Sequence, residues 1–405
     1  MKLEGLRVID LSLFLPGPLA TQMLADHGAE VIKVESLHEG EPNRHLGAKR
    51  NDVSVYFSNT HRGKKSLALN LKDPAGVEAL LRLAEQSDVF VEAFRPGVAE
   101  RLGVGYPQVS ARAPGIVYAS IAAFGQTGPY RDLAAHDLAT EAMTGVLSLN
   151  RGGDGAPAIP GLAAADMLSS MMTLSGILMA LLRRKDSGRG DYIDMAMADA
   201  LLACVPNNLG TAMSQRKPPV LAEERSLGGN ALYQIYRTQD DDFVVLAGQE
   251  IKFIRNLFEA LGRPDLIPLC EQVPGPGQDP VRAFLRETFA TKTKAAWVEW
   301  FRGRDIAFAP VKTLPEALDD PHFAARGMVL KDARGWDHLG VPIRFTHEPG
   351  RVKFDAPAHG EHSSEILRAL RYSAQEIEAL RARGVFRDAS PAEIEKHHGG
   401  GESGG

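Results

Sequence analysis

The first residue in this sequence that suggests chemistry is Asp166, a single carboxylate that ends the small-residue run GLAAAD. The mostly apolar stretch MLSSMMTLSGILMALLRR follows directly and predicts a helix with Asp166 at its start. The positive end of a helix favours an ionised carboxylate, and neighbouring Ala, Leu and Met side chains would exclude water. These surroundings suit a nucleophile or a base. The alternative is an ordinary N-cap, in which the side chain only accepts hydrogen bonds from the first helical N–H groups.

The beginning of the chain predicts the elements that must position this carboxylate. The run LRVIDLSLFLPGPLATQMLADHGAEVIKVE indicates a strand, a turn at Pro16, Gly17 and Pro18, an amphipathic helix and a second strand after Gly28. This βαβ opening lacks GxGxxG, so it does not favour an NAD or FAD site. Up to about residue 205, β-rich runs keep alternating with helical patterns. This alternation predicts a large α/β domain with a parallel, Rossmann-like sheet.

The pattern changes in the second half of the chain, so two domains are expected. A β-rich run, three helical patterns and the strand-like AFAPVKTL predict a smaller α/β domain. A chain of 405 residues also exceeds the usual size of one domain. We expect the large domain over 1–205, a linker over 206–227, the small domain over 228–330 and a disordered low-complexity tail over 391–405.

Composition argues against several classes of partner. The formal net charge is −5 and no basic stripe with interleaved aromatics is present, so nucleic-acid binding is not expected. Cys204 and Cys270 stand in ordinary sequence without CxxC, which fits the reduced cytoplasm. No His/Cys cluster has zinc spacing, and His397 and His398 are expected to be solvated rather than to bind metal.

A membrane location is not expected either. The first residues enter a strand pattern without a charged leader and a long apolar run, so we expect no signal peptide. The longest apolar stretch, Met167 to Leu182, contains Ser, Thr and Gly and is too short for a bilayer span. We therefore expect a soluble protein.

Several further motifs occur in one order along the chain. They are RGKKSLALNLK at 62–72, FRPGVAERLGVGY at 94–106, FGQTGPY at 124–130, AHD at 135–137 and SGRGDYIDMAMADAL at 187–201. Their order and spacing resemble the family III CoA-transferases, which include formyl-CoA and carnitine CoA-transferases and the α-methylacyl-CoA racemases. The resemblance implies a homodimer of interlocked rings, with residues 331–390 returning to the large domain and the active site between domains of different subunits.

The resemblance also implies that CoA or an acyl-CoA binds as substrate, with no permanently bound metal, flavin or nicotinamide. CoA phosphates need Lys or Arg side chains and backbone amides. The residues expected at the CoA site are Pro16, Arg62, Lys65, Lys72, Arg95 and Gly125. Many relatives have Arg after the second strand where this chain has Glu35 and Ser36. Lys33 or Arg44 is therefore expected to supply the missing phosphate contact.

Two chemistries could use Asp166. In CoA transfer its carboxylate attacks an acyl-CoA thioester and then carries CoA as an aspartyl thioester to a small carboxylic acid, with backbone amides near Gly228 and Gly229 or in FGQTGP binding the oxyanions. In racemisation two groups exchange the α-proton.

The resemblance assigns the racemase's second group to His136 and an acidic residue to Glu250. The DMLSSM sequence after the carboxylate is closer to the transferases. We expect a CoA transferase first and an α-methylacyl-CoA racemase second, with a non-catalytic CoA-binding module as a minor alternative.

Overall fold

The computed structural model describes residues 1–398, which divide into two compact units. The first unit comprises residues 1–204 together with the chain from His322 onward, and the second comprises Val205–Pro321. The expected linker, 206–227, therefore belongs to the second unit. The return to the first unit begins at 322, before the expected position at 331, because β12 (Val329–Lys331) and β13 (Asp337–Leu339) form a two-stranded sheet of the first unit.

The first unit is built on a seven-stranded sheet, as the alternation of elements predicted. Six strands are parallel, and only the edge strand at the C-terminal end of the chain is antiparallel. In sheet order the strands are β14 (Phe386–Arg387), β5 (Lys65–Leu69), β2 (Glu30–Glu35), β1 (Arg7–Asp10), β6 (Val89–Glu92), β7 (Val117–Ala122) and β8 (Tyr192–Ala196). The parallel strands follow the order of a Rossmann sheet, in which the chain reverses its direction of travel between β1 and β6.

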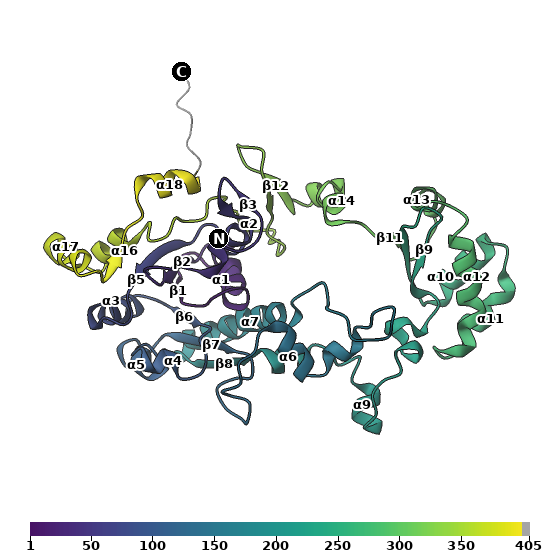
Figure 1. The fold of residues 1–405 in the computed structure, drawn as a ribbon, viewed down its shortest axis with the longest axis horizontal. Helices are drawn as coiled ribbons and strands as arrows, with labels where there is room; N and C mark the ends of the chain where they lie inside the picture. Colours follow the sequence, from purple (N-terminus) through teal and green to yellow (C-terminus); the bar gives the residue numbers. More distant parts are fainter. Residues whose placement is uncertain (399–405) are drawn as a thin grey trace, which may run out of the picture. The chain divides into compact units, whose positions relative to one another are not determined.

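Helices cover both faces of this sheet because successive side chains of a strand point to opposite faces. On β1, Val8 packs in the apolar cluster with Leu24 and Ile177, whereas Ile9 packs in the opposite cluster with Leu80 and Leu380. The helices of the first face are α1 (Pro16–Asp26), α7 (Ala164–Ser187) and α8 (Met197–Ala203). Those of the second are α3 (Pro74–Ala84), α5 (Tyr106–Arg112), α16 (Ser363–Ala369) and α17 (Ala374–Ala382). Figure 1 shows α3 and α5 on one side of the strands and α1 and α7 on the other.

The start of α1 shows why no dinucleotide fingerprint is needed here. Pro16 and Pro18 lack N–H groups, so the first turn offers few donors to a phosphate. Gly17 is required by close packing, since a Cβ at this position would lie 2.1 Å from the Ser12 Cβ. The turn after β1 is therefore built for packing and for shape rather than for pyrophosphate binding.

Helix α7 is longer than the apolar stretch suggested. It has 24 residues and a mean hydropathy of 1.5 over its best window, so it alone among the described helices meets the length and composition of a membrane span. One such helix is weak evidence for a membrane, and α7 packs against α1, β7 and β8 of the same unit.

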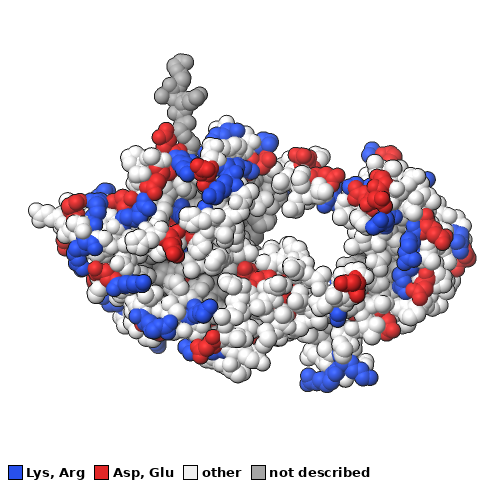
Figure 2. Space-filling model, viewed as in Figure 1, with Lys and Arg blue, Asp and Glu red and all other residues white. Residues whose placement is uncertain are grey.

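The second unit, residues 205–321, has its own core. Its antiparallel sheet contains β9 (Tyr233–Arg237), β10 (Phe243–Ala247) and β11 (Phe308–Pro310), with β10 in the middle. The helices α10 (Ile251–Ala260), α12 (Asp279–Phe289) and α13 (Lys294–Phe301) pack their apolar side chains, among them Trp297, against it. On the face drawn in Figure 2, the described Lys and Arg side chains are interspersed with Asp and Glu.

The expected tail differs from the structure over its first part. Residues Pro391–His398 form the helix α18, and the half-buried His397 places its Nδ1 3.1 Å from the Ala356 carbonyl oxygen. Burial lowers the pKa of His397 to about 4, so this residue is not a solvated tail histidine. His398 lies on the surface, 2.8 Å from a Glu361 carboxylate oxygen. Residues 399–405 of the predicted tail lie outside the described residues.

Candidate active site

A large cavity of about 980 Å³ lies at the carboxyl edge of the parallel sheet, where the chain segments after β1 and β6 diverge. This is the position at which Rossmann-type sheets bind their ligands. Apolar side chains form most of its wall. The polar and aromatic residues of the wall are Phe14, Phe94, Arg95, Phe124, Arg131, His136 and Asp166. The predicted residues Asp166, His136, Arg95 and Pro16 are thus brought to one cavity.

Asp166 is the third residue of α7 and faces this cavity without capping the helix. The N-cap position is Ala163, which has no side chain to accept a hydrogen bond. Carboxylates of the short helix α6 (Asp137–Met143) take that role instead: Asp137 accepts from the Asp166 N–H at 3.1 Å, and Glu141 from the Ala164 N–H at 3.2 Å. Because these N–H groups are already bonded, the Asp166 side chain is free for chemistry.

A helix N-terminus alone would favour the ionised form of Asp166 and lower its pKa, whereas the surroundings in the structure raise this pKa. Burial raises the pKa of its carboxyl group to about 7, and the negative charge of Asp137 adds to the increase. Asp166 therefore changes its charge near neutral pH. Carboxyl groups with strongly shifted pKa values in a cavity are typical of functional sites.

Tyr56 is a neighbour of Asp166 that the sequence did not indicate. It lies in α2 (Val55–His61), where burial, followed by the charge of Asp166, raises the pKa of its phenol to about 12, partly offset by the Asn43 side chain. Tyr56 lines neither the Asp166 cavity nor the smaller cavity at the ends of β2 and β5, so its relation to Asp166 is electrostatic. The surrounding sequence VSVYFSNT has no catalytic motif, so only the folded structure reveals this neighbour.

His136 precedes α6 and lines the same cavity as Asp166. Its ring contacts Phe14 edge to face, with ring centroids 5.7 Å apart and planes at 85°. The two groups that a racemase would need therefore face one cavity. The role of His136 stays a prediction.

Two arginines give this cavity positive charge. Arg95 is exposed, and no ion-pair partner for it is present among residues 1–398. It precedes a turn in which Gly97 adopts φ 80°, a conformation that glycine tolerates best. Arg131 donates from Nε to the Gln126 carbonyl oxygen at 2.9 Å and pairs with Asp132 at 3.1 Å. Both guanidinium groups are placed to bind carboxylate or phosphate oxygens.

A second cavity, of about 470 Å³, lies beside the first at the ends of β2 and β5. Leu13 and Phe94 line both cavities, so the two are adjacent. Lys72 stands at the second cavity with Asn70, His38 and the other residues of the loop 36–42. The predicted cation Lys72 is thus at a cavity, although at a different one from Arg95.

The structure places Arg62 and Lys65 away from both cavities. Arg62 is buried, and its guanidinium group pairs with Asp26 at 2.7 Å and donates to the Leu339 carbonyl oxygen at 2.7 Å. The Lys65 ammonium pairs with Glu30 at 2.9 Å and Glu365 at 2.7 Å. Their charges are satisfied within the protein, so the geometry gives no support to a CoA contact by either residue.

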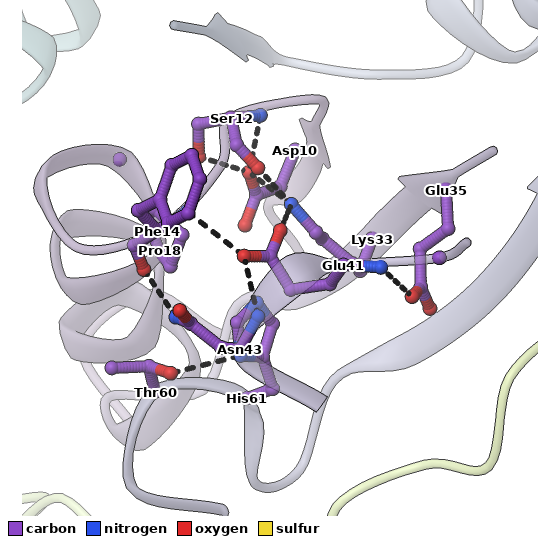
Figure 3. Close-up of polar contacts among 12 residues, drawn as sticks. Asp10, Ser12, Phe14, Pro18, Lys33, Glu35, Glu41, Asn43, Thr60 and His61 are labelled. Carbon is purple, nitrogen blue, oxygen red and sulfur yellow. Dashed lines mark hydrogen bonds and ion pairs between the residues drawn. The ribbon is translucent and has the colours of Figure 1, made fainter. Parts of the chain in front are cut away.

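The two expected substitutes for the missing arginine are also engaged internally. Arg44 donates two hydrogen bonds to the Glu35 carboxylate, at 2.8 and 2.7 Å. Lys33 is fully buried and pairs with Glu41 at 3.0 Å, as Figure 3 shows. Glu35, which stands where many relatives have Arg, therefore binds a cation of its own chain rather than a phosphate.

Gly125 shapes the loop after β7 and does not line the cavity, although its neighbour Phe124 does. Its φ is 79°, and a Cβ would lie 3.3 Å from Asp194 and Ala196. The next N–H, that of Gln126, donates to the Asp194 carboxylate at 3.0 Å. This N–H is therefore already bonded and does not serve as a donor to an oxyanion of the reaction.

The remaining predicted residues belong to the second unit. Glu250 is an exposed residue that precedes α10, and Gly228 and Gly229 lie in the turn η4 (Arg225–Gly229). The Gly229 N–H donates to the Glu224 carbonyl oxygen at 3.0 Å, which leaves it no free proton for an oxyanion. The catalytic role of Glu250 stays a prediction. Among residues 1–398, no group of three or more His, Cys, Asp or Glu side chains is arranged to hold a metal ion.

Comparison with known proteins defines the family. A model of CoA-transferase family III matches residues 3–363. The succinyl-CoA:glutarate CoA-transferase of Mus musculus is 32% identical over 95% of this chain and 90% of its own length. The chain therefore belongs to CoA-transferase family III.

The family also includes a relative with the second chemistry. The alpha-methylacyl-CoA racemase of Homo sapiens is 32% identical over 95% of this chain and 98% of its own length. Among solved structures, a CAIB/BAIF family protein from Brucella suis matches with a TM-score of 0.79 and 29% identity over 91% of this chain and 99% of that one. Both the α/β fold and the expected family are thus confirmed.

Proposed function

We propose that this protein transfers CoA from an acyl-CoA thioester to a carboxylic acid through a covalent aspartyl-CoA thioester on Asp166. The observation that carries the proposal is the Asp166 carboxylate, which faces the larger cavity while other carboxylates cap its helix. A pKa of about 7 leaves a substantial ionised fraction at neutral pH and makes the carboxylate a better nucleophile than an ordinary aspartate.

The reaction proceeds in two matched halves. An Asp166 oxygen attacks the thioester carbonyl and expels CoA thiolate, which gives a mixed anhydride. The thiolate then attacks the aspartyl carbonyl, and the donor leaves as a carboxylate that carries an oxygen from Asp166. The acceptor carboxylate reverses these steps, forming a second anhydride on Asp166 before CoA thiolate attacks the acceptor carbonyl. Because each anhydride would hydrolyse in water, the apolar wall of the cavity supports the mechanism.

The two adjacent cavities suit the two ends of an acyl-CoA. We place the acyl group and thioester in the cavity of Asp166 and the nucleotide in the smaller cavity, with Lys72 near its phosphates. The positive charge of Arg95 and Arg131 supports a dicarboxylic acid as acceptor, since a guanidinium binds the distal carboxylate in a forked geometry. The relative from Mus musculus is named for two dicarboxylic acids, succinate and glutarate.

We also propose that the protein is a homodimer, as the family resemblance implies. Apolar side chains of α7 are exposed in the single chain: Met171 at 40%, Leu178 at 39%, and Met179 and Leu182 each at 66%. A contiguous apolar helix face of this kind is typical of a protein interface. Sedimentation that finds a folded monomer at nanomolar concentration would contradict the dimer.

Covalent trapping tests the transferase proposal. The full-length protein is incubated with succinyl-CoA, quenched with hydroxylamine and digested, and the Asp166 peptide is analysed by mass spectrometry. We expect a hydroxamate on Asp166. Asp199→Asn is the matched control, because Asp199 is also the third residue of a helix, α8, in the same unit. If no hydroxamate forms in the parent protein with any acyl-CoA tried, and no α-proton exchange occurs in D₂O, a CoA-binding module without catalysis is favoured.

Racemisation is the second candidate because His136 and Asp166 face one cavity and a racemase is among the relatives. An α-methylacyl-CoA incubated in D₂O distinguishes the two reactions. A transferase leaves the α-position unlabelled, and His136→Ala retains measurable transfer. Rapid deuterium incorporation that His136→Ala reduces by about 10²- to 10⁴-fold would instead identify a racemase.

A further inference from the structure

Phe14 has an unusual backbone conformation for its residue type. Its φ is 62°, in the left-handed region. This region is unfavourable for a bulky side chain because the Cβ approaches the following carbonyl oxygen, and glycine is the usual residue there. A conformation of this kind persists only where the surrounding structure holds it, and such positions concentrate at functional sites.

Two side chains of the loop after β2 hold the Phe14 backbone. The Glu41 carboxylate accepts from the Phe14 N–H at 2.8 Å, and the Asn43 Nδ2 donates to the Phe14 carbonyl oxygen at 2.5 Å. Figure 3 shows both side chains pointing to the Phe14 backbone. Both backbone polar groups of Phe14 are thus fixed from the same loop, which restrains the rotation that would relax φ.

This loop is itself anchored by buried charge. Glu41 and Lys33 are both completely buried and pair at 3.0 Å, and the Lys33 ammonium also lies 3.7 Å from the Asp10 carboxylate. Burial alone lowers the pKa of Lys33, but the carboxylates of Asp10, Glu41 and Glu35 outweigh it and raise the pKa. The ion pair with Lys33 therefore holds the Glu41 side chain in place to accept from the Phe14 N–H.

The held conformation directs the Phe14 ring into the cavity of Asp166. The ring lines this cavity and lies edge to face against His136 at 5.7 Å, while 36% of the residue remains exposed. Rotation of φ to the ordinary negative range would move the Cα–Cβ bond and separate the ring from His136. The strain thus positions an aromatic group beside the two residues closest to the chemistry.

We propose that Phe14 is the specificity-determining residue of the acyl pocket, which its Glu41- and Asn43-held conformation restricts to short acyl groups. The proposal rests on the proposed use of acyl-CoA as substrate. A ring fixed on the wall occupies volume that a long acyl chain would need. An alanine at this position opens that volume, and a site with an extra apolar volume gains affinity for each added methylene.

Binding of two stable thioethers, S-ethyl-CoA and S-octyl-CoA, tests this without requiring turnover. Calorimetry gives the ratio of their dissociation constants for the parent, Phe14→Ala and Phe14→Gly. We expect both variants to shift this ratio towards S-octyl-CoA by about tenfold or more. Phe345→Ala is the control, because Phe345 is an aromatic of the same unit with a similar exposed fraction, 39%, and does not line either cavity. Its ratio should stay within about twofold of the parent.

Two further variants test the hold on the backbone. Phe14→Gly should have a higher unfolding midpoint than Phe14→Ala, since glycine adopts a positive φ without the Cβ clash. Asn43→Ala retains the Phe14 ring but removes the hydrogen bond to the Phe14 carbonyl oxygen. The ratio of dissociation constants of this variant should also shift in favour of S-octyl-CoA. An unchanged ratio in Phe14→Ala and Phe14→Gly would overturn the proposal, as would an equal shift in Phe345→Ala.

The outcomes separate this proposal from the proposed function. A parent protein that binds S-ethyl-CoA and shows the predicted shifts, yet transfers no CoA, refutes only the transferase reaction. A parent that transfers CoA while its Phe14 variants keep the parental ratio refutes only the role of Phe14. A parent that binds neither thioether contradicts both.

Discussion

Two carboxylates at the carboxyl edge of the same sheet, Asp166 and Asp10, have opposite electrostatic environments. Burial by itself acts to raise the pKa of both carboxyl groups. At Asp10 the ammonium groups of Lys33 and Lys64, with hydrogen bonds from Ser12 and Thr21, overcome that effect and hold the pKa well below its usual range. At Asp166 no cation among residues 1–398 offsets burial, and Asp137 adds negative charge, so the pKa of Asp166 rises to about 7.

The difference separates a carboxylate that belongs to a buried ion-pair network from the carboxylate that we propose as the nucleophile. The network of Asp10, Lys33, Glu41 and Lys64 is fully buried and paired, so its charges fix the loops that surround the cavities. Asp166 is poorly stabilised as an anion, which is the condition for a nucleophile that reacts at neutral pH.

The largest effect is expected from removal of the reactive carboxylate. Asp166→Asn should reduce CoA transfer by at least about 10³-fold, because covalent catalysis cannot proceed without the nucleophile. Steady-state transfer between succinyl-CoA and a dicarboxylic acid measures the loss, and circular dichroism checks the fold. Asp199→Asn should keep near-parental activity. A folded Asp166→Asn protein that retains more than a few per cent of activity would refute every catalytic assignment made for this residue.

The next largest effect is expected in the paired network. Lys33→Met removes the cation between Asp10 and Glu41 and leaves buried negative charge that only Lys64 partly compensates. The free energy of unfolding should fall by about 3–5 kcal/mol, the usual result of breaking a buried ion pair. Urea denaturation measures it. Lys65→Met is the control, since Lys65 forms a partly exposed pair, and should cost about 1 kcal/mol or less. Equal effects in the two variants would show that burial of the network adds nothing.

The pH dependence of activity should report Asp166. The reactive form is the ionised carboxylate and the pKa is about 7, so kcat/KM of the free enzyme should rise about tenfold per pH unit below 7 and level off above it. An ordinary aspartate would already be ionised near pH 5. A rate profile that is flat between pH 5 and 8 would show that the environment of Asp166 does not raise its pKa.

The smallest effect is on stability. The folded-state pKa of Asp166 lies above its unfolded value, so the ionised carboxylate destabilises the fold. The free energy of unfolding of the parent should therefore decrease as pH rises from about 4 through 7. At pH 8 the free energy of unfolding of Asp166→Asn, measured by urea denaturation, should therefore exceed that of the parent by on the order of 1 kcal/mol after solvent screening. This gain should vanish at pH 4. A variant less stable than the parent at pH 8 would contradict this sign.

The sequence predicted the fold well because its signals are local. Alternating strand and helix patterns predicted the parallel sheet of the first unit. Asp166, His136 and Arg95 were found because each lies in a short motif at the edge of that sheet. Patterns of this kind specify elements and their ends, where functional side chains collect.

The sequence could not predict which charges are already paired. Arg62 and Lys65 stand in a strongly basic segment, yet each is paired with a carboxylate distant along the chain, Asp26 and Glu30 respectively. The electrostatic effect of Asp166 on Tyr56 and the Glu41 contact to Phe14 were missed for the same reason, since both depend on how separate segments fold together. Pairing of this kind depends on tertiary distances, which residue type and local spacing do not contain.

The most direct test of the central claim, that Asp166 carries CoA, follows an oxygen atom. The enzyme is incubated with an acyl-CoA and an acceptor acid labelled with oxygen-18 in its carboxylate, then digested for mass spectrometry. Because the acceptor forms an anhydride with Asp166 before CoA thiolate attacks the acceptor carbonyl, one labelled oxygen should remain on the Asp166 carboxylate. The predicted result is one oxygen-18 in the Asp166 peptide after a single turnover, up to two after many turnovers, and none in the Asp199 peptide. Efficient transfer without label on Asp166 would contradict the account.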